Sequence, residues 1–286
     1  MMYYILANPF SVNGQGKRVT KALIPYLVQQ GITYELFETQ HGFDEARLIK
    51  VIMTQKTPLD RVLIIGGDGT LSLALNALPS DQTFSYIPAG SGNDFARAFG
   101  IPLNQPLKAF KQLHQANPKT IHVLKYDSQE MSGIAVNNIG IGLDAAIVAA
   151  TNKGVVKQLL NKIKLGRLAY LLNALGVLFS KHPFSITVNH TEFTQAFLFT
   201  MTKHPFFGGG IPLAPEGSLL DSDIHLVELD RFNLIGIVAL IPKVFKGKHF
   251  TNRRVQYQIG KTFTLSTTSE QPMQIDGETF VIKANK

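Results

Sequence analysis

The first part of the chain alternates short apolar runs with stretches of helical periodicity. Apolar runs rich in β-branched and aromatic residues lie at 3–7, 33–38, 62–65 and 84–87. Helical periodicity follows each run, at 17–30, 43–54, 71–78 and 95–99. Strands that alternate with helices form parallel βαβ units, and a short continuous apolar run is typical of a strand buried on both faces. The pattern predicts a Rossmann-like α/β domain with a parallel sheet over residues 1–127.

The pattern changes beyond residue 127. Short strand-like segments joined by turns lie at 133–137, 185–188, 197–202, 224–229 and 262–266. Clear helical periodicity is confined there to 155–179 and 233–245. Because runs of strands favour antiparallel packing, we expect a second, β-rich and mainly antiparallel domain over residues 128–286.

Glycine-rich loops follow three of the predicted strands, at 8–16, 66–70 and 90–94. In an open parallel sheet, ligands bind beyond the carboxyl ends of the strands. The adjacent Gly66 and Gly67 let the backbone turn sharply and present N–H groups to phosphate oxygens, and the next helix points its positive end to the same place. Asp68 suits this position if a Mg²⁺ ion lies between carboxylate and phosphate. The loops indicate a nucleotide site, although an ordinary tight turn explains GGDG taken alone.

Carboxylates stand in glycine-flanked turns at four positions. They are Asp68 in GGDGT, Asp94 in GSGND, and Asp276 and Glu278 in QIDGE. Phosphoryl transfer needs Mg²⁺ on the phosphates, N–H groups around them, and a base for the acceptor hydroxyl. The four carboxylates together favour that chemistry, whereas each one alone is equally consistent with a plain β-turn.

Composition narrows the class of protein. The 286 residues are 45% hydrophobic and 17% charged, as in folded globular proteins. Cysteine is absent from the sequence, which excludes disulfides and thiolate zinc sites. The first residues lack a basic signal region, and the apolar runs at 168–179 and 234–242 are too short to span a bilayer. We therefore expect a cytoplasmic protein.

The net charge of +8 favours an anionic partner. Asp and Glu are absent from residues 145–191 and 231–269, where basic residues stand beside bulky apolar ones. These basic residues include Lys153, Lys157, Lys162, Lys164, Arg167, Lys181, Lys243, Lys246, Lys248, Arg253, Arg254 and Lys261. Basic and apolar residues together favour peripheral binding to an anionic membrane surface over nucleic acid, with a solvated positive face as the alternative.

The glycine-rich motifs resemble those of one family when they are read in order. GGDGT, PAGSGNDFAR, NNIGIGLDA, LGRLAY, FFGGGIPLAPEG and QIDGE follow one another along the chain. This series resembles the diacylglycerol-kinase-like bacterial lipid kinases, which are related to sphingosine and ceramide kinases and, through GGDGT, to NAD kinases. The resemblance extends from residue 8 to residue 278. It implies an α/β nucleotide domain, a β-sandwich-like second domain, and an active site in the cleft between them.

The resemblance also implies roles for individual residues. ATP contacts are expected from Asn8, Ser11, Thr39, Gly66, Gly67, Asp68, Gly69, Thr70 and Ser91. Asp68 and Asp94 would hold Mg²⁺, and Asp276 and Glu278 would complete the acidic cluster, with Asp276 as a further metal ligand. One of Asp276 and Glu278 would accept the proton of the lipid hydroxyl, and the sequence does not say which. The implied reaction is ATP- and Mg²⁺-dependent phosphorylation of a diacylglycerol-like lipid at the membrane surface.

The chain departs from the family pattern at several positions. Ser72 and Leu73 stand where the family usually has Asn-Glu, and Val12-Asn13-Gly14 stands where it prefers an immediate glycine. Asp221-Ser222-Asp223 replaces an Asp-Asp-Gly that supports a structural Mg²⁺ in the family, so a second metal is open to question. The family's returning tail is expected to be short or absent.

These departures leave two alternatives to a lipid kinase. One is a lipid- or nucleotide-binding regulatory protein with weak catalysis. The other is a soluble NAD-kinase-like enzyme, against which the missing Asn-Glu argues. A homodimer formed through a strand edge of the second domain also stays open.

Overall fold

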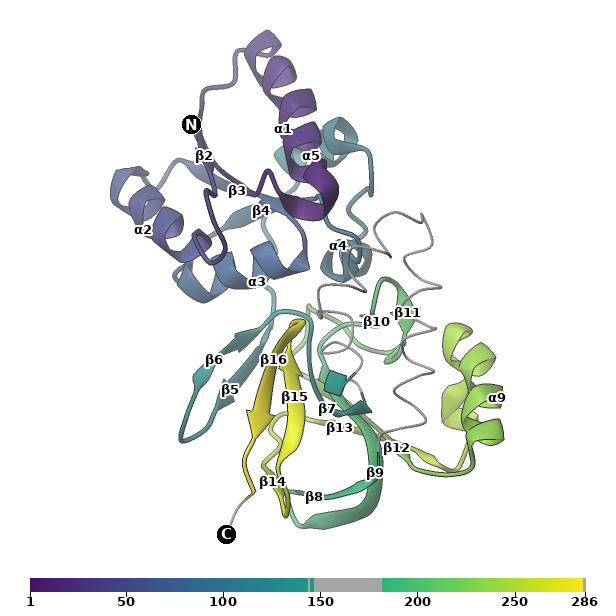
Figure 1. Cartoon of the computed structure of the whole chain (residues 1–286). Coiled ribbons are helices and arrows are strands. Elements are labelled where there is room, and N and C mark those ends of the chain that lie inside the picture. The colour runs from purple at the N-terminus through teal and green to yellow at the C-terminus, as the bar shows by residue number, and fades with distance from the viewer. Residues whose placement is uncertain (144, 147–181, 285–286) are drawn as a thin grey trace. The chain divides into compact units, whose positions relative to one another are not determined.

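The computed structural model describes residues 1–143, 145–146 and 182–284, which belong to two compact units (Figure 1). The first unit is Met1–Val136 with Gly208–Gly210, and the second is Asn137–Phe207 with Ile211–Lys286. The division therefore lies after Val136, later than the boundary expected after residue 127.

The first unit is built on a four-stranded parallel sheet of order β2-β1-β3-β4. Its strands are β1 (Tyr3–Ala7), β2 (Tyr34–Glu38), β3 (Arg61–Gly66) and β4 (Phe84–Pro88). The central strands β1 and β3 are the most apolar, and Ile5, Leu63 and Ile64 are fully buried. The predicted parallel α/β domain is confirmed, because strands buried on both faces require continuous apolar runs.

Helices accompany the strands as βαβ units require. They are α1 (Ser11–Gln29), α2 (Glu45–Gln55), α3 (Asp68–Ala77), α4 (Asp94–Ala98) and α5 (Pro106–Gln115). Helix α1 packs against α5, and α2 packs against α3 (Figure 1). Helix α3 begins at Asp68, earlier than the pattern predicts, so that the acidic residue lies in a helical turn. Helix α1 is interrupted by left-handed residues at Val12, Asn13 and Gly14.

The first unit also includes a hairpin of β5 (Leu124–Asp127) and β6 (Ser132–Ala135). The side chain of Asn76 on α3 donates a hydrogen bond to the carbonyl of Ile134 at 2.9 Å and accepts one from its N–H at 3.0 Å. These bonds attach the hairpin to α3, which explains why the unit continues to Val136.

The second unit contains an eight-stranded antiparallel sheet. The path β13-β12-β9-β7-β15-β16 is joined by β8, which pairs with β9 and β14. The strands are β7 (Asn138–Gly142), β8 (Phe184–Val188), β9 (Thr191–Thr202), β12 (Ile224–Asp230), β13 (Val255–Gly260), β14 (Leu265–Thr267), β15 (Gln271–Ile275) and β16 (Glu278–Ile282). The short β10 (Phe206–Phe207) and β11 (Ile211–Pro212) form a separate hairpin. The antiparallel second domain is confirmed, but the strand expected at 262–266 is wrong, since β14 begins at Leu265.

Helix α9 (Leu234–Phe245) and the 3₁₀ turn His249–Thr251 lie beside this sheet. The Asn233 side chain caps α9 by accepting the N–H of Gly236 at 2.7 Å. Leu240 joins a buried cluster with Val227 and other sheet residues. The helix predicted at 155–179, the LGRLAY motif and the basic residues from Lys153 to Lys181 lie outside the described residues. No helix in the described ranges is long and apolar enough to cross a membrane.

Candidate active site

The loops that carry the predicted nucleotide residues leave the same edge of the parallel sheet. The backbone N–H of Asn8, after β1, donates to the carbonyl of Ile65 at 2.9 Å, and that of Ala89, after β4, donates to Gly66 at 2.7 Å. Thr39 follows β2 at the same edge. These bonds extend the sheet pairing beyond the strands, so the loops begin from fixed positions.

The glycines of this edge are required by close packing. A Cβ atom on Gly66 would lie 2.5 Å from the side chain of Thr70, and one on Gly90 would lie 2.6 Å from the Cα of Gly67. Neither Gly66 nor Gly67 has a positive φ, so the turn does not need glycine for a left-handed backbone. The glycines instead let the loop after β3 touch the loop after β4.

That contact brings Asp68 and Asp94 together. The N–H of Asp94 donates to Oδ2 of Asp68 at 3.3 Å. Oδ2 of Asp94 accepts the N–H of Gly209 at 2.9 Å, and its Oδ1 is 3.9 Å from Nε of Arg97. Oδ1 of Asp68 is buried and has no hydrogen-bond partner among the described residues.

Two neighbouring carboxylates with little solvent are electrostatically costly. Burial, with a smaller contribution from the charge of Asp94, raises the pKa of Asp68 to about 6. A cation bound between the two carboxylates would remove that cost, and Mg²⁺ commonly takes one or two carboxylates and completes its shell with water and phosphate. No group of three or more His, Asp or Glu in the described part of the chain forms a metal-ligand set. Because Mg²⁺ often takes only one or two carboxylates when substrate phosphates complete its shell, the chemistry of the pair fits a metal that binds together with a nucleotide.

Asn8 and Thr70 form the second contact of this edge. Nδ2 of Asn8 donates to Oγ1 of Thr70 at 3.0 Å, while Oδ1 of Asn8 accepts the N–H of Phe10 at 3.0 Å. Oγ of Ser11 is buried without a hydrogen-bond partner in the described part of the chain. These three polar side chains thus lie at adjoining loops, as expected for one ligand site.

Glu45 is a buried residue of this edge that the sequence did not reveal. It is 2% exposed, and its Oε2 has no hydrogen-bond partner among the residues described. Burial raises its pKa, whereas hydrogen bonds from Thr70 and Asn8 oppose that rise. An acidic residue in the first turn of a helix is ordinary, so no sequence signal distinguished Glu45 from a solvated helix terminus.

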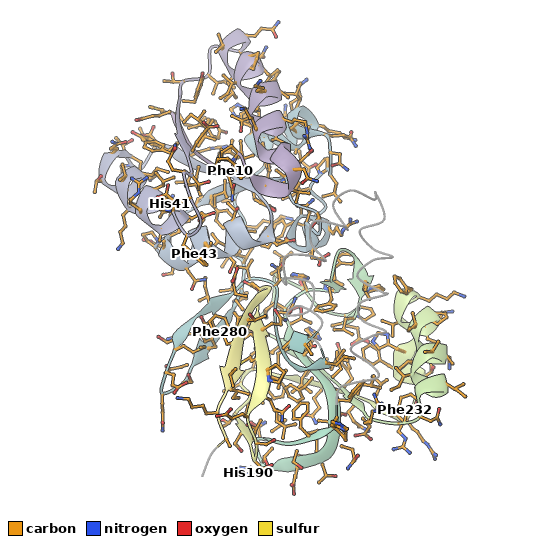
Figure 2. All side chains as sticks on the ribbon, in the orientation of Figure 1. Phe10, His41, Phe43, His190, Phe232 and Phe280 are labelled. Atoms are coloured by element: carbon orange, nitrogen blue, oxygen red, sulfur yellow. The ribbon has the colours of Figure 1, made fainter. Side chains whose placement is uncertain are left out.

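The remaining nucleotide candidates differ in exposure. Ser91 and Gly69 are exposed, whereas Thr39 is 2% exposed and presents little side chain. Two aromatic residues lie in the loops after β1 and β2: Phe10 is 70% exposed and Phe43 is 67% exposed (Figure 2). The edge is therefore polar at the loops after β3 and β4 and partly aromatic at the loops after β1 and β2.

The QIDGE motif lies in the second unit, where Asp276 and Gly277 form the two-residue turn between β15 and β16. Their φ values of 50° and 91° are those of a type I′ turn, for which Asp-Gly is favoured. Oδ1 of Asp276 accepts the N–H groups of Asn137 at 2.8 Å and of Asn138 at 3.0 Å. Asp276 is thus fixed by the strand next to its hairpin.

Asn137 is itself held by a buried histidine. Nε2 of His204 lies 2.9 Å from Oδ1 of Asn137, and Oγ1 of Thr202 donates to the carbonyl of Asn137 at 3.0 Å. Burial lowers the pKa of His204 to about 4, so the imidazole is neutral at ordinary pH. Glu278, by contrast, is exposed. The four carboxylates expected from the sequence therefore form one pair in each unit, and the two members of the second pair have different surroundings.

Family comparisons agree with this division. The first unit is an α/β domain with a parallel sheet, and residues 2–126 match the diacylglycerol kinase catalytic domain. Residues 137–282 match the YegS C-terminal NAD kinase beta sandwich-like domain. The chain belongs to the diacylglycerol-kinase-like family of lipid kinases, which are phosphotransferases with an alcohol acceptor.

Individual relatives align over nearly the whole chain. The YtlR protein of Bacillus subtilis is 28% identical over 286 residues, covering 96% of this chain and 93% of that protein. The diacylglycerol kinase of Bacillus subtilis is 28% identical over 280 residues, covering 96% of this chain and 88% of that enzyme. A crystal structure from Bacillus anthracis has a TM-score of 0.72 at 20% identity and covers 99% of this chain and 94% of that one. The last likeness concerns the fold alone.

Proposed function

We propose that this protein transfers the γ-phosphoryl group of ATP to the hydroxyl of a diacylglycerol-like lipid. The carboxylate pair of Asp68 and Asp94 carries the proposal, because the two acidic residues lie together and Oδ1 of Asp68 is buried without a hydrogen-bond partner among the described residues. Both carboxylates would bind Mg²⁺, which neutralises phosphate charge when it is bound. The N–H groups at the start of α3 would face the phosphates, as helix N-termini commonly do.

The polar side chains around this pair would hold the nucleotide. Thr70 and Asn8 are already oriented by their mutual hydrogen bond, and the buried hydroxyl of Ser11 lies in the adjoining loop. A ligand that meets preoriented groups loses less conformational freedom on binding. Ser91 would contact the phosphates from the loop after β4, and Thr39 would contribute through its backbone because its side chain is buried.

Glu278 is the proposed base for the lipid hydroxyl. A general base must reach the proton that it accepts, and Glu278 is exposed. Oδ1 of Asp276 already accepts two backbone hydrogen bonds. Asp276 would therefore act as a positioning residue that fixes the hairpin carrying Glu278.

The proposed enzyme binds the membrane reversibly through α9. Ile235, Val238 and Phe245 are 84%, 45% and 47% exposed, although the helix packs on a buried cluster with its other face. Exposed basic residues lie in the last turn of α9 and in the segment after it, namely Lys243, Lys246, Lys248, Arg253 and Arg254. Apolar side chains beside lysine and arginine suit the interface of an anionic membrane. Because ATP is the donor, the proposed location is the cytoplasmic membrane surface.

A phosphate-transfer assay tests the proposal. Protein, Mg²⁺ and ATP labelled at the γ-phosphate are incubated with mixed micelles of diacylglycerol, ceramide or a membrane lipid extract. Label should enter the lipid phase, and Asp68→Asn or Asp94→Asn should reduce transfer by about a hundredfold or more. Asp81→Asn changes an exposed carboxylate after α3 and serves as the matched control. ATP binding without transfer to any lipid would favour a regulatory protein, and lipid-independent labelling of NAD would favour a soluble kinase.

A further inference from the structure

A lysine is buried among the acidic residues of the second unit. Lys203 directly follows β9, and only 1% of its side chain is exposed. Its Nζ hydrogen-bonds to the loop 221–223, which precedes β12. A buried ammonium group needs polar or charged partners. Without them, its transfer out of water costs roughly several kcal/mol.

The compensation comes from three oxygen atoms of the loop. Nζ of Lys203 donates to the carbonyl oxygen of Asp221 at 2.8 Å and to that of Asp223, and it lies 3.8 Å from Oδ1 of Asp221. Two carbonyls and a carboxylate are the ligand types that hard cations such as Mg²⁺ and Ca²⁺ take in proteins. In this chain an ammonium group lies among them.

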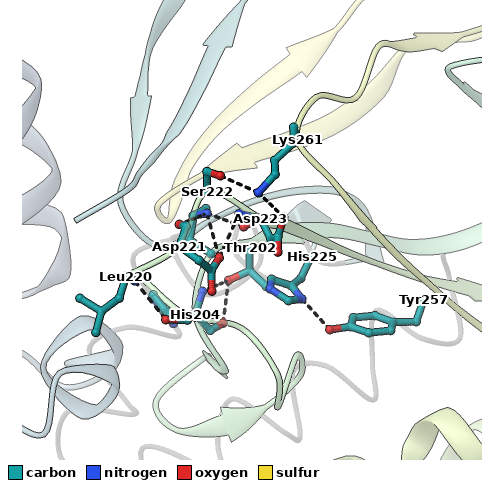
Figure 3. Close-up of polar contacts among 11 residues, drawn as sticks. Thr202, His204, Leu220, Asp221, Ser222, Asp223, His225, Tyr257 and Lys261 are labelled. Carbon is teal, nitrogen blue, oxygen red and sulfur yellow. Dashed lines mark hydrogen bonds and ion pairs between the residues drawn. The ribbon is translucent and has the colours of Figure 1, made fainter. Parts of the chain in front are cut away.

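The second carboxylate of the loop also has a cation from the chain. Nζ of Lys261 lies 2.6 Å from Oδ1 of Asp223 and donates to Oγ of Ser222 at 2.6 Å (Figure 3). The pair lowers the pKa of Asp223. Two lysines therefore face two aspartates, and the loop carries no excess negative charge that would attract a divalent ion.

We infer that the ammonium group of Lys203 is the resident cation of the 221–223 loop, in place of the structural Mg²⁺ that the family resemblance implies there. The residues do not fit that metal. A divalent ion placed among the same oxygens would repel an ammonium a few ångströms away, by roughly 8 kcal/mol at 4 Å with an effective dielectric constant of 20. This inference does not depend on the proposed kinase activity.

The position of Lys203 gives the cation a structural effect. Its neighbours Thr202 and His204 contact Asn137, and Asn137 donates to Asp276. Fixing the loop to Lys203 therefore fixes the chain that positions the QIDGE turn. Loss of the ammonium should loosen the loop and the turn together.

Metal binding to the unaltered protein is the first test. Mn²⁺ is titrated without nucleotide and followed by electron paramagnetic resonance, in the wild type and in Asp221→Asn. We expect the same number of bound ions and the same affinity in both proteins. A bound Mn²⁺ that is lost in Asp221→Asn would overturn the inference, whether or not the protein has kinase activity.

Chemical rescue is the second test. Lys203→Ala should lower the melting temperature by roughly 5–10 °C, and propylammonium, which replaces the missing atoms and the charge, should recover part of the loss. Propanol serves as the uncharged control. Lys261→Ala removes an exposed lysine that pairs with Asp223 of the same loop and should change the melting temperature little. Equal effects of the two alanine variants, or equal rescue by propanol, would refute the role of the charge; if Lys203→Ala does not fold, the Mn²⁺ test decides.

Discussion

The proposed membrane binding through α9 has an electrostatic and an apolar contribution, and each can be removed without changing a residue of the proposed active site. The charge variant replaces Lys243, Lys246, Lys248 and Arg253 with Gln. Arg254 is kept, because it lies 3.8 Å from Asp230 and its charge is partly compensated. The apolar variant combines Ile235→Gln with Val238→Gln.

The magnitudes follow from exposure and charge. Each basic residue near an anionic surface contributes about 1 kcal/mol, so four residues contribute about 4 kcal/mol, or roughly a thousandfold in partitioning. Ile235 is 84% exposed and Val238 is 45% exposed. Burying those exposed parts in the interface contributes about 2–3 kcal/mol together, which corresponds to roughly 30- to 150-fold.

Vesicle co-sedimentation measures both contributions. The wild type should bind vesicles containing phosphatidylserine or phosphatidylglycerol at low salt and dissociate as the Debye length falls from about 10 Å at 0.1 M salt to about 3 Å at 1 M. The charge variant should lose this salt dependence, whereas the apolar variant should bind more weakly with the salt dependence retained. In the kinase assay both should raise the apparent KM for vesicle lipid and leave that for ATP unchanged.

Matched substitutions on the first unit control for net charge and surface hydrophobicity. Replacing the exposed Lys17, Lys21, Lys50 and Lys108 with Gln removes the same charge, and Leu59→Gln removes a leucine that is 79% exposed. Neither control should weaken vesicle binding beyond a few-fold. Equal losses in the control and α9 variants, or binding by the wild type that is indifferent to salt, would refute α9 as the docking face.

Three further predictions concern carboxylates. Asp68→Asn should abolish phosphate transfer yet raise the melting temperature of metal-free protein at pH 8, because it removes a buried charge beside Asp94; a lower melting temperature would contradict that repulsion. Glu278→Gln should lower kcat with little change in KM for ATP. Asp276→Asn should lower kcat and also lower stability, because it weakens the hydrogen bonds from the N–H groups of Asn137 and Asn138. Identical effects of the two variants would refute the assignment of Glu278 as base and Asp276 as positioning residue. Burial raises the pKa of Glu228 to about 8, so its stabilising contribution is complete below about pH 4.5 and is lost as pH rises through 8; thermal melts of Glu228→Gln should show a smaller decline over that range.

The sequence predicted those parts of the fold that have continuous or periodic apolar patterns. The strands of the first unit and helix α9 fall close to their expected positions for that reason. Strand β13 was missed although its apolar residues alternate with glutamines, which is the period of a half-buried strand. Strand β15 was missed because Pro272 and two glutamines interrupt its apolar residues. Helix α5 was missed as well, although Leu107, Phe110 and Leu113 recur at helical spacing.

The candidate site was predictable where chemistry is carried by glycine-flanked motifs. Asp68 and Asp94 were expected together, and the structure joins them through loops that only glycine allows to touch. Buried charges were not predictable, because their burial depends on partners elsewhere in the chain. From the sequence, Glu45 is indistinguishable from a solvated residue at a helix start, and Lys203 from a surface lysine. The burial of Lys203 depends on its contact with the loop at Asp221.

The acidic loop at 221–223 and the carboxylate of Asp68 differ in whether a lysine of the chain compensates their negative charge. The loop at 221–223 receives ammonium groups from Lys203 and Lys261, which suits a purely structural role. Asp68 receives no cation from the described residues, and its raised pKa records the cost of that arrangement. The chain places a lysine against one acidic loop and supplies no described cation to Asp68, which supports the proposed binding of a cation from outside at that second site. The proposed Mg²⁺ requirement should therefore depend on Asp68 and Asp94 and be insensitive to Asp221.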